Sequence, residues 1–552
     1  MKTDIAGESM NAEAMKDWLT PRPVSAAAVL GCAWPALLLA TVCLLPYLNK
    51  AFLIDDPHFL AMARQIIKHP MHPMDFDICW NTIEPCTKAY LLTPGNALMG
   101  YVLVPTILGG AHEWTAHLTQ LVLAWIAIVA MTSLIFRLGW DSLHATTGAL
   151  LLVAIPPFLP MASTAMPDML ATAVALVAME RLAAWKQEQK WSPGAAAAVA
   201  LGLAGFARSH LALLLPLAAF FLLDSLKPRE ILGQVRRNLW LWSPVFAGCG
   251  LLLAIILAVR EHNLAISPPS VVLVRQHIVN NLLAYLLYFV FPLPLAACWL
   301  ANRLKGGRLL TVFILLGVAA IPLLQHWKLS FVLFLAVIGF GVLADLLFQA
   351  LKRCEHTDLF LVLWILIPFP IVYYTHLPMK YLLPCIPAVI LLCFRLLDGV
   401  SVRFARAAVY VLIVASTGYS LLILHSDAEF ANFGRDAMYR LIGPHVVAGE
   451  RVWYPGQYWS FWYAPLAGAT LTYLGGPQPM PGDLLVVDVY AAGDLSPLSR
   501  FPHRTLVETI FHKYQFGRTM GAGKGLYANG SGFWLWGFGE SDKDRFELWR
   551  ID

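Results

Sequence analysis

The chain has 552 residues, of which 59% are hydrophobic and 13% are charged, and its mean hydropathy is +0.64. These values lie outside the usual range of soluble proteins and exclude an ordinary globular enzyme. The formal net charge of +5 does not indicate a nucleic-acid partner, because the cations fall between apolar segments, where membrane orientation explains them. We therefore predict an all-α polytopic membrane protein.

Apolar segments long enough to cross a bilayer recur along the chain, and we count about 13 of them at a rise of about 1.5 Å per residue. The short polar segment 1–23 precedes the first span and carries no secretory cleavage site, so that span is expected to remain as an anchor. The stretch 90–109 is predicted to be a re-entrant or interfacial helix. The predicted spans lie near residues 24–47, 115–136, 145–161, 166–186, 194–207, 209–225, 239–259, 281–300, 309–325, 329–350, 359–375, 380–397 and 407–424.

Basic residues predict the orientation of these spans. Each cluster of Lys and Arg follows an even-numbered span or precedes the first, which places every cluster on one side of the membrane. The positive-inside rule makes that side cytoplasmic. The N-terminal tail 1–23 is then cytoplasmic, residues 24–427 form the transmembrane domain with an outer loop 48–114, and residues 428–552 lie outside the cytoplasmic membrane.

The C-terminal segment differs in composition from the spans. From Ala428 onward Gly, Pro, Trp and Tyr become frequent, and a strand-like run, 484–490, follows a Pro-Gly-Asp turn. This pattern predicts a small α+β domain. In the outer loop, Cys79 and Cys86 could form a disulfide if the compartment is oxidising, and the alternative is two unpaired thiols.

Two adjacent acids, Asp55 and Asp56, follow the first span directly. One of them, Asp56, is expected to cap the helix that begins at Pro57. Capping does not explain the second acid. A carboxylate at the edge of a membrane cavity has its pKa raised by desolvation and by a like-charged neighbour, which suits a general base.

A third acid, Asp168, stands at the outer start of the fourth span, after Met166 and Pro167. It could simply be a favourable residue for a helix start, since an acid there interacts well with the helix dipole. Ionisable residues at membrane depth also tend to mark functional sites. The predicted topology places Asp168 on the same face as Asp55.

Three cations, Arg208, Arg275 and Lys380, also fall on the outer side, where cations are scarcer. Together they would suit a phosphate-bearing lipid headgroup, although each could instead snorkel or pair with an acid. The outer loop also holds His58, His69 and His72 near several acids. A divalent metal site is one reading of these histidines, but their spacing matches no tight ligand motif, and solvated loop histidines are the alternative.

Three motifs follow one another along the chain: Asp55-Asp56-Pro57-His58-Phe59, Met166-Pro167-Asp168, and Lys380-Tyr381-Leu382-Leu383-Pro384-Cys385-Ile386-Pro387. Together they resemble the bacterial glycosyltransferases of the GT-C superfamily, particularly the protein O-mannosyltransferases and the lipid A aminoarabinose transferase. The resemblance rests on the order, spacing and common sidedness of these motifs over roughly residues 45 to 400. Asp56 stands where the family usually has Glu, and Thr93-Pro94-Gly95 stands where it usually has His-Pro-Pro.

The resemblance implies transfer of a sugar from a polyprenyl-phosphate donor to a lipid, glycan or protein acceptor at the outer face of the membrane. By this analogy Asp55 acts on the acceptor, Asp168 is a second acid near it, and Lys380 contacts the donor phosphate. If the displacement is in-line, the sugar configuration inverts. The predicted catalytic residues are thus Asp55, Asp56 and Asp168, and the predicted donor-binding residues are Lys380, Tyr381, Arg208, Arg275 and His58.

Two other functions fit a chain of this kind. A transporter or flippase of lipid-linked saccharide would also bind a lipid phosphate, but its expected signature is ionisable residues near the membrane midplane. The notable charges here cluster at one interface instead, which favours the enzyme. The other alternative is a non-catalytic relative that binds a lipid-linked sugar.

Overall fold

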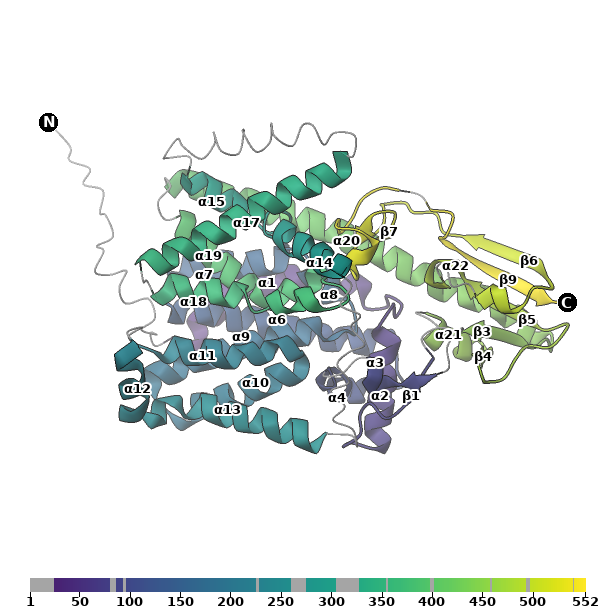
Figure 1. Ribbon diagram of the computed structural model, residues 1–552, viewed down its shortest axis with the longest axis horizontal. Helices are drawn as coiled ribbons and strands as arrows, with labels where there is room; N and C mark the ends of the chain where they lie inside the picture. Colours follow the sequence, from purple (N-terminus) through teal and green to yellow (C-terminus); the bar gives the residue numbers. More distant parts are fainter. Residues whose placement is uncertain are drawn as a thin grey trace.

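The computed structural model shows a bundle of apolar helices with a small β-sheet beyond one end (Figure 1). It describes residues 24–79, 86–92, 96–224, 228–259, 275–303, 327–353, 356–397, 402–456, 459–492, 497–539 and 541–552. The N-terminal tail 1–23, the predicted span 309–325 and residues 93–95 lie outside this part of the chain. The prediction of a polytopic helical membrane protein with a small α+β region at its C-terminal end is confirmed.

Within the described residues, seven helical segments have the length and apolar composition needed to cross a membrane. Three shorter apolar segments, Ser142–Ala154, Trp191–Ala207 and Ser209–Leu222, accompany them. The seven segments are Ala26–Tyr47, Glu113–Arg137, Leu239–Ala258, Phe331–Arg353, His356–Tyr373, Met379–Leu397 and Ala405–Val447.

The elements of the bundle follow the predicted spans closely in most places. They are α1 (Ala26–Leu44), η2 (Leu45–Tyr47), α6 (Glu113–Arg137), α7 (Ser142–Ala154), α8 (Phe158–Met161), α9 (Pro167–Glu188), α10 (Trp191–Ala207), η3 (Ser209–Leu213), α11 (Leu214–Leu222), α12 (Pro228–Arg237), α13 (Leu239–Ala258), α14 (Arg275–Tyr288), α15 (Leu295–Arg303), α17 (Trp327–Arg353), α18 (His356–Ile365), η6 (Phe369–Tyr373), η7 (Met379–Cys385) and α19 (Ile386–Leu397).

Proline interrupts several spans that we predicted as single helices. The predicted span 145–161 ends as α7 at Ala154, before Pro156 and Pro157, and resumes only as the short α8. The predicted span 281–300 is likewise split between α14 and α15, with Pro292 and Pro294 in the gap. Proline lacks the N–H that a helix interior requires and disfavours helical geometry in the residue before it, so these two predictions were wrong in their continuity.

Helix α9 lies at the centre of the bundle, where it packs against α6 and α10 (Figure 1). Most of its side chains are buried, including the acid Glu180. That carboxylate accepts hydrogen bonds from Oγ of Ser133 at 2.6 Å and Nε of Arg137 at 2.7 Å, and it also pairs with Arg181. A buried charge is tolerated only when it is paired in this way, so α9 can carry ionic residues inside the bundle.

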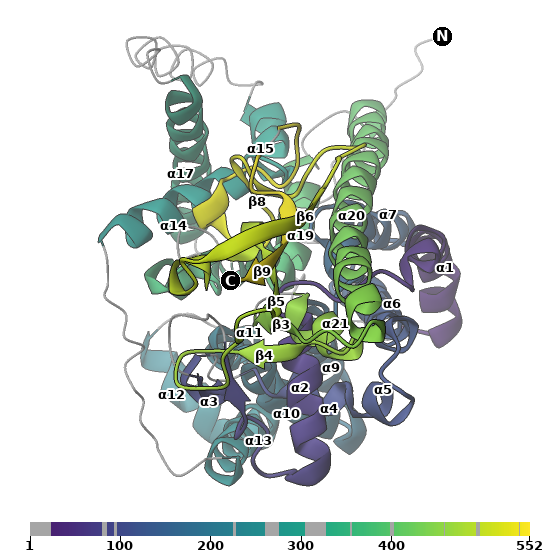
Figure 2. The same cartoon turned by 90° about the vertical axis from the view of Figure 1, so that its right-hand side faces the viewer.

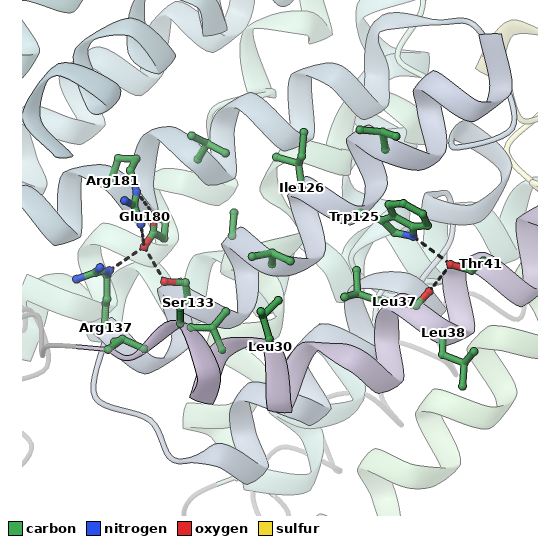
Figure 3. Close-up of a pocket in the computed structure, with 17 residues that line it drawn as sticks. Leu30, Leu37, Leu38, Thr41, Trp125, Ile126, Ser133, Arg137, Glu180 and Arg181 are labelled. Atoms are coloured by element: carbon green, nitrogen blue, oxygen red, sulfur yellow. Dashed lines mark hydrogen bonds and ion pairs between the residues drawn. The ribbon is translucent and has the colours of Figure 1, made fainter. Parts of the chain in front are cut away.

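A groove of about 890 Å³ runs along the outside of the bundle between α1, α6 and α9 (Figure 3). Its walls are mainly apolar, with Glu180 and Arg181 at one end and Thr41 and Trp125 at the other (Figure 3). Leu30, on the α1 wall, is 54% exposed. None of the predicted site residues lines this groove. It is a mainly apolar surface groove and lies apart from the polar site described below.

The outer loop forms short elements at the end of the bundle that faces the sheet (Figure 1). In place of one interfacial helix over 90–109, the chain makes three short helices, and the amphipathic α2 packs its apolar face against α4 and α5. Cys79 and Cys86 are joined in a disulfide, as one of the two sequence readings proposed. The elements are α2 (Asp56–Lys68), β1 (Asp77–Ile78), β2 (Thr87–Lys88), α3 (Ala89–Leu92), α4 (Leu98–Val102) and α5 (Val104–Leu108).

Helix α20 (Val402–Val447) connects the bundle to the C-terminal region as one continuous helix of 46 residues. It continues past the predicted end of the last span at residue 424 and through the predicted domain boundary at residue 428. Its second half is amphipathic, with Phe430, Met438 and Leu441 buried and Arg440 exposed. Hydropathy therefore marks where the helix leaves the apolar layer, and not where the helix ends.

The C-terminal sheet has five strands in the order β4-β3-β5-β9-β6 and lies across the end of the bundle (Figure 2). The central strand β5, which we predicted, is buried along its whole length, pairs in parallel with β3 and pairs antiparallel with β9. The elements are β3 (Val452–Pro455), α21 (Ser460–Leu466), β4 (Thr470–Thr472), β5 (Leu484–Asp488), α22 (Val489–Ala492), η8 (Pro497–Arg500), β6 (Arg504–Phe511), β7 (Met520–Gly521), β8 (Lys524–Gly525), η9 (Asn529–Ser531) and β9 (Arg545–Ile551).

The disulfide leads to a direct chemical prediction. When protein isolated without reductant is denatured and alkylated, Cys79 and Cys86 should remain unmodified while the other cysteines react, because only free thiols are alkylated. Peptide mass spectrometry with and without prior reduction measures this. Alkylation of Cys79 or Cys86 without reduction would show that the outer loop is not crosslinked in the isolated protein.

Candidate functional site

Residues from four separate parts of the bundle meet at the end where the outer loop and the sheet lie. Asp55 comes from the start of α2 and Lys380 from η7. The ammonium of Lys380 lies 3.7 Å from Oδ2 of Asp55, with the lysine side chain 2% exposed and the aspartate side chain 36% exposed. The structure therefore pairs the predicted acid of the outer loop with the predicted donor-binding lysine, and leaves the acid accessible.

A second ion pair lies beside the first. Asp168, at the start of α9, accepts a hydrogen bond at 2.6 Å from the guanidinium of Arg208, which follows α10. The Arg208 guanidinium also lies over the ring of Tyr381, 4.4 Å from its centre, and Tyr381 is the neighbour of Lys380. Two carboxylates and two cations thus form one cluster around η7.

The second pair is not fully satisfied by the protein. Within the described part of the chain, neither Oδ2 of Asp168 nor Nε of Arg208 has a hydrogen-bond partner, although both atoms are buried. An unpartnered buried polar atom costs about 1–3 kcal/mol, and native structures usually satisfy such atoms with water or a ligand. A polar ligand that reached this side of the cluster could form hydrogen bonds with these two atoms, which the described part of the protein leaves unsatisfied.

Asp56 has a different environment from its neighbour. It is completely buried, and its two carboxylate oxygens accept backbone hydrogen bonds from Leu53 at 2.9 Å and Ala165 at 2.8 Å. Burial raises the pKa of Asp56 to about 7, against the opposing effects of Lys50 and these hydrogen bonds. The expected capping bond to the start of α2 is absent, so that prediction was wrong: the side chain joins the outer loop to the segment before α9.

Two further predicted ligands are less informative. His58 is buried, with its ring against Phe59 and Phe76, and burial lowers its pKa to about 4, so the imidazole is neutral. Arg275 is the first residue of α14, and its side chain lies outside the part of the structure that is described. In the described residues no three His, Cys, Asp or Glu side chains converge in a way that could hold a metal ion.

One residue close to the site, His376, was missed from the sequence. Its Nε2 lies 3.2 Å from the hydroxyl of Tyr381, and its Nδ1 lies 3.0 Å from Oγ1 of Thr375. Burial lowers the pKa of His376 to about 4. Its position four residues before Lys380 was the signal that could have identified it.

A buried ionic group behind the cluster was also missed. Lys50 and Asp427 are both completely buried and form an ion pair at 2.5 Å. Lys50 also donates to Oγ of Ser163 at 3.1 Å, and Asp427 accepts from the hydroxyl of Tyr527 at 2.7 Å. The group therefore links the outer loop, α20 and the C-terminal region. Such a link cannot be predicted from a local sequence pattern.

No protein-family model matches the chain, and no curated protein matches it. Two crystal structures of ArnT from Cupriavidus metallidurans resemble it. The one bound to undecaprenyl phosphate is 16% identical, with 88% of this chain and 97% of that chain covered and a TM-score of 0.43. The one in the apo state is 15% identical, with coverages of 87% and 96% and a TM-score of 0.38. Since both TM-scores are below 0.5, the functional assignment depends on the side chains of the site.

The contrast between the two adjacent acids can be tested by stability. Asp56→Asn replaces an acceptor oxygen with a donor NH₂ group facing a backbone N–H and should destabilise the fold by about 1–3 kcal/mol. Asp55→Asn changes a partly exposed group that makes no capping bond and should have little effect. Thermal unfolding of both variants in the same detergent measures this. Equal stability of the two variants would contradict the geometry.

The neutral state of His376 can be tested by a pH profile. Because its pKa lies near 4 in the folded protein, this histidine takes up no proton between pH 5 and 8. His376→Gln should therefore leave the shape of the pH–activity curve unchanged over that interval, even if it changes the maximal rate. A limb of the curve near pH 6.5 that disappears in His376→Gln would show that the imidazole titrates in the folded protein.

Proposed function

We propose that this protein is a membrane glycosyltransferase of the GT-C type, which moves a sugar from a polyprenyl-phosphate donor to a hydroxyl or amine of an acceptor. The observation that carries the proposal is the cluster around η7. An accessible carboxylate lies 3.7 Å from a buried ammonium, and a second carboxylate–guanidinium pair lies beside them. In this proposal the accessible carboxylate serves as the base for the acceptor, and the two cations bind the lipid phosphate.

The chemistry requires a base and an anion-binding site more than it requires an acid. The acceptor oxygen or nitrogen attacks the anomeric carbon of the sugar and gives its proton to Asp55. The bond between that carbon and the phosphate oxygen breaks, and the polyprenyl phosphate leaves with the electron pair. Lys380 and Arg208 then stabilise the negative charge that develops on the phosphate. An in-line attack inverts the configuration of the sugar.

The remaining residues of the cluster support these groups. Asp168 holds Arg208 through the 2.6 Å hydrogen bond, and the ring of Tyr381 lies beneath the same guanidinium. Asp56, which we first grouped with the catalytic acids, is assigned a positioning role because its two oxygens bind backbone N–H groups. His58 is a neutral ring within α2 that contacts Phe59 and Phe76, and Arg275 stays a predicted donor ligand.

We further propose that the cluster faces the outer side of the cytoplasmic membrane. Lys186 pairs with Asp224 and Arg137 pairs with Glu180, both away from the cluster and in segments that the positive-inside rule makes cytoplasmic. The N-terminus would then be cytoplasmic and the sheet region extracytoplasmic. Polyprenyl-phosphate donor and membrane-associated acceptor would reach the site from the bilayer and its outer surface.

The role of Asp55 is tested by transfer of radiolabelled sugar from polyprenyl-phosphate donors in liposomes that contain purified protein and envelope extract. Asp55→Asn removes the base and should lower transfer at least about 10²-fold. Asp75→Asn is a matched control, because Asp75 is an acid of the same outer loop that pairs with Lys88 on the surface. This control should transfer sugar at close to the wild-type rate.

Two outcomes would contradict the proposal. Transfer by Asp55→Asn at the wild-type rate would remove Asp55 from the mechanism. Labelled donor that crosses the bilayer unchanged, at equal rates with wild type and Asp55→Asn, would instead indicate a transporter. Retained binding of polyprenyl phosphate by an inactive Asp55→Asn variant would separate loss of chemistry from loss of folding.

A further inference from the structure

The C-terminal region supplies one wall of the Lys380 environment. The ring of Tyr527 lies 5.2 Å from the Lys380 ammonium, and the ring of the adjacent Tyr381 lies at 5.7 Å. Tyr527 is 3% exposed and stands between β8 and η9, beyond the sheet strand β6 in the sequence. A residue from the last part of the chain thus reaches the cluster formed by the bundle.

The position of this ring is fixed through its hydroxyl. Tyr527 donates a hydrogen bond of 2.7 Å to Asp427. The Asp427 carboxylate also forms an ion pair with Lys50 at 2.5 Å and accepts a hydrogen bond of 3.3 Å from the hydroxyl of Thr519. All four side chains are buried. A buried hydrogen bond to a charged group contributes about 1.5–3 kcal/mol, so the ring has a strong anchor.

The same C-terminal segment also contacts the chain that leads into η7. The side-chain oxygen of Asn529 accepts from the backbone N–H of Leu377 at 2.8 Å, and its amide donates to Asn281 at 2.9 Å. Leu377 precedes Lys380 by only a few residues. Tyr527 therefore contacts the Lys380 ammonium, and Asn529 holds the backbone that leads to Lys380.

The surroundings of the ammonium suit a group that must bind an anion. Its neighbours are two aromatic rings, the sulfur of Met166 at 3.4 Å and a carboxylate at 3.7 Å. Ring faces stabilise a cation without accepting strong hydrogen bonds from it. The ammonium donates a hydrogen bond to the Met166 sulfur, which is a weak acceptor, so its N–H donors keep capacity for phosphate oxygens.

We propose that Tyr527 is a positioning residue that holds the Lys380 ammonium ready for the donor phosphate. This inference rests on the proposed function. It gives the C-terminal region a part in the binding site, which its sequence did not reveal. Removing the ring should weaken binding of a polyprenyl phosphate by roughly 2- to 30-fold, the range expected for a cation–π contact.

The test is a double-mutant cycle on the full-length protein in lipid nanodiscs, with the dissociation constant of polyprenyl phosphate as the readout. Lys380→Met and Tyr527→Leu should each weaken binding. If the ring acts through the lysine, the double variant should bind no more weakly than Lys380→Met alone. Tyr527→Phe keeps the ring but loses its anchor to Asp427, so its affinity should fall between those of the wild type and Tyr527→Leu.

Tyr514→Leu is the matched control for general loosening of the C-terminal region. Its ring lies 4.8 Å from the guanidinium of Arg518 and the substitution removes the same atoms as Tyr527→Leu. This control should bind polyprenyl phosphate as the wild type does. If Tyr514→Leu and Tyr527→Leu weakened polyprenyl-phosphate binding equally, the proposal would be overturned. It would also be overturned if the losses of affinity in Tyr527→Leu and Lys380→Met were fully additive in the double variant.

The cycle also separates this inference from the proposed function. Unchanged binding in Lys380→Met would remove the lysine from the donor site and with it the donor assignment itself. Weaker binding in Lys380→Met together with wild-type binding in Tyr527→Leu would leave the donor assignment intact and overturn the role of Tyr527 alone.

Discussion

The buried ion pair between Lys50 and Asp427 holds together the parts of the molecule that make the site. Lys50 lies between the first span and α2, whereas Asp427 lies in the part of α20 that leaves the apolar layer. Removing one member of a fully buried pair costs about 3–5 kcal/mol, because the other charge is left without compensation. The outer loop and the C-terminal region therefore cannot separate from each other without exposing or stranding a charge, and Asp55 and Tyr527 depend on that arrangement for their positions.

Interrupted helices are the second condition for this site. In lipid a non-helical backbone leaves N–H and C=O groups unsatisfied, so it is tolerated only where protein or water surrounds it. The long α-helices are interrupted between α7 and α9, at Arg208, and between α18 and α19, where only the short α8, η6 and η7 form. Asp56 accepts a hydrogen bond from the backbone N–H of Ala165 in the first of these interruptions. These interruptions bring polar groups, among them Asp168, Arg208 and Lys380, to one end of an otherwise apolar bundle.

The sequence predicted the outline of this arrangement because hydropathy and charge are local properties. Span positions, the buried strand β5 and the common face of Asp55, Asp168 and Lys380 could all be read from such patterns. The pairing within the cluster could not, since it depends on how helices pack. Asp55 and Asp56 have the same chemistry and adjacent positions, and only burial separates them. Asp427 and Tyr527 could not be identified from a local motif, because Asp427 lies 377 residues from Lys50 and 100 residues from Tyr527, and tertiary structure alone brings them together.

The two ion pairs of the cluster differ in length, which gives their cations unequal roles in the proposed donor binding. Arg208 is held tightly by Asp168 at 2.6 Å, whereas Lys380 is 3.7 Å from Asp55, beyond hydrogen-bond length. An arriving phosphate therefore competes more easily for Lys380 than for Arg208. Donor binding would then draw the ammonium toward the phosphate and leave the Asp55 carboxylate, which is 36% exposed, to the acceptor.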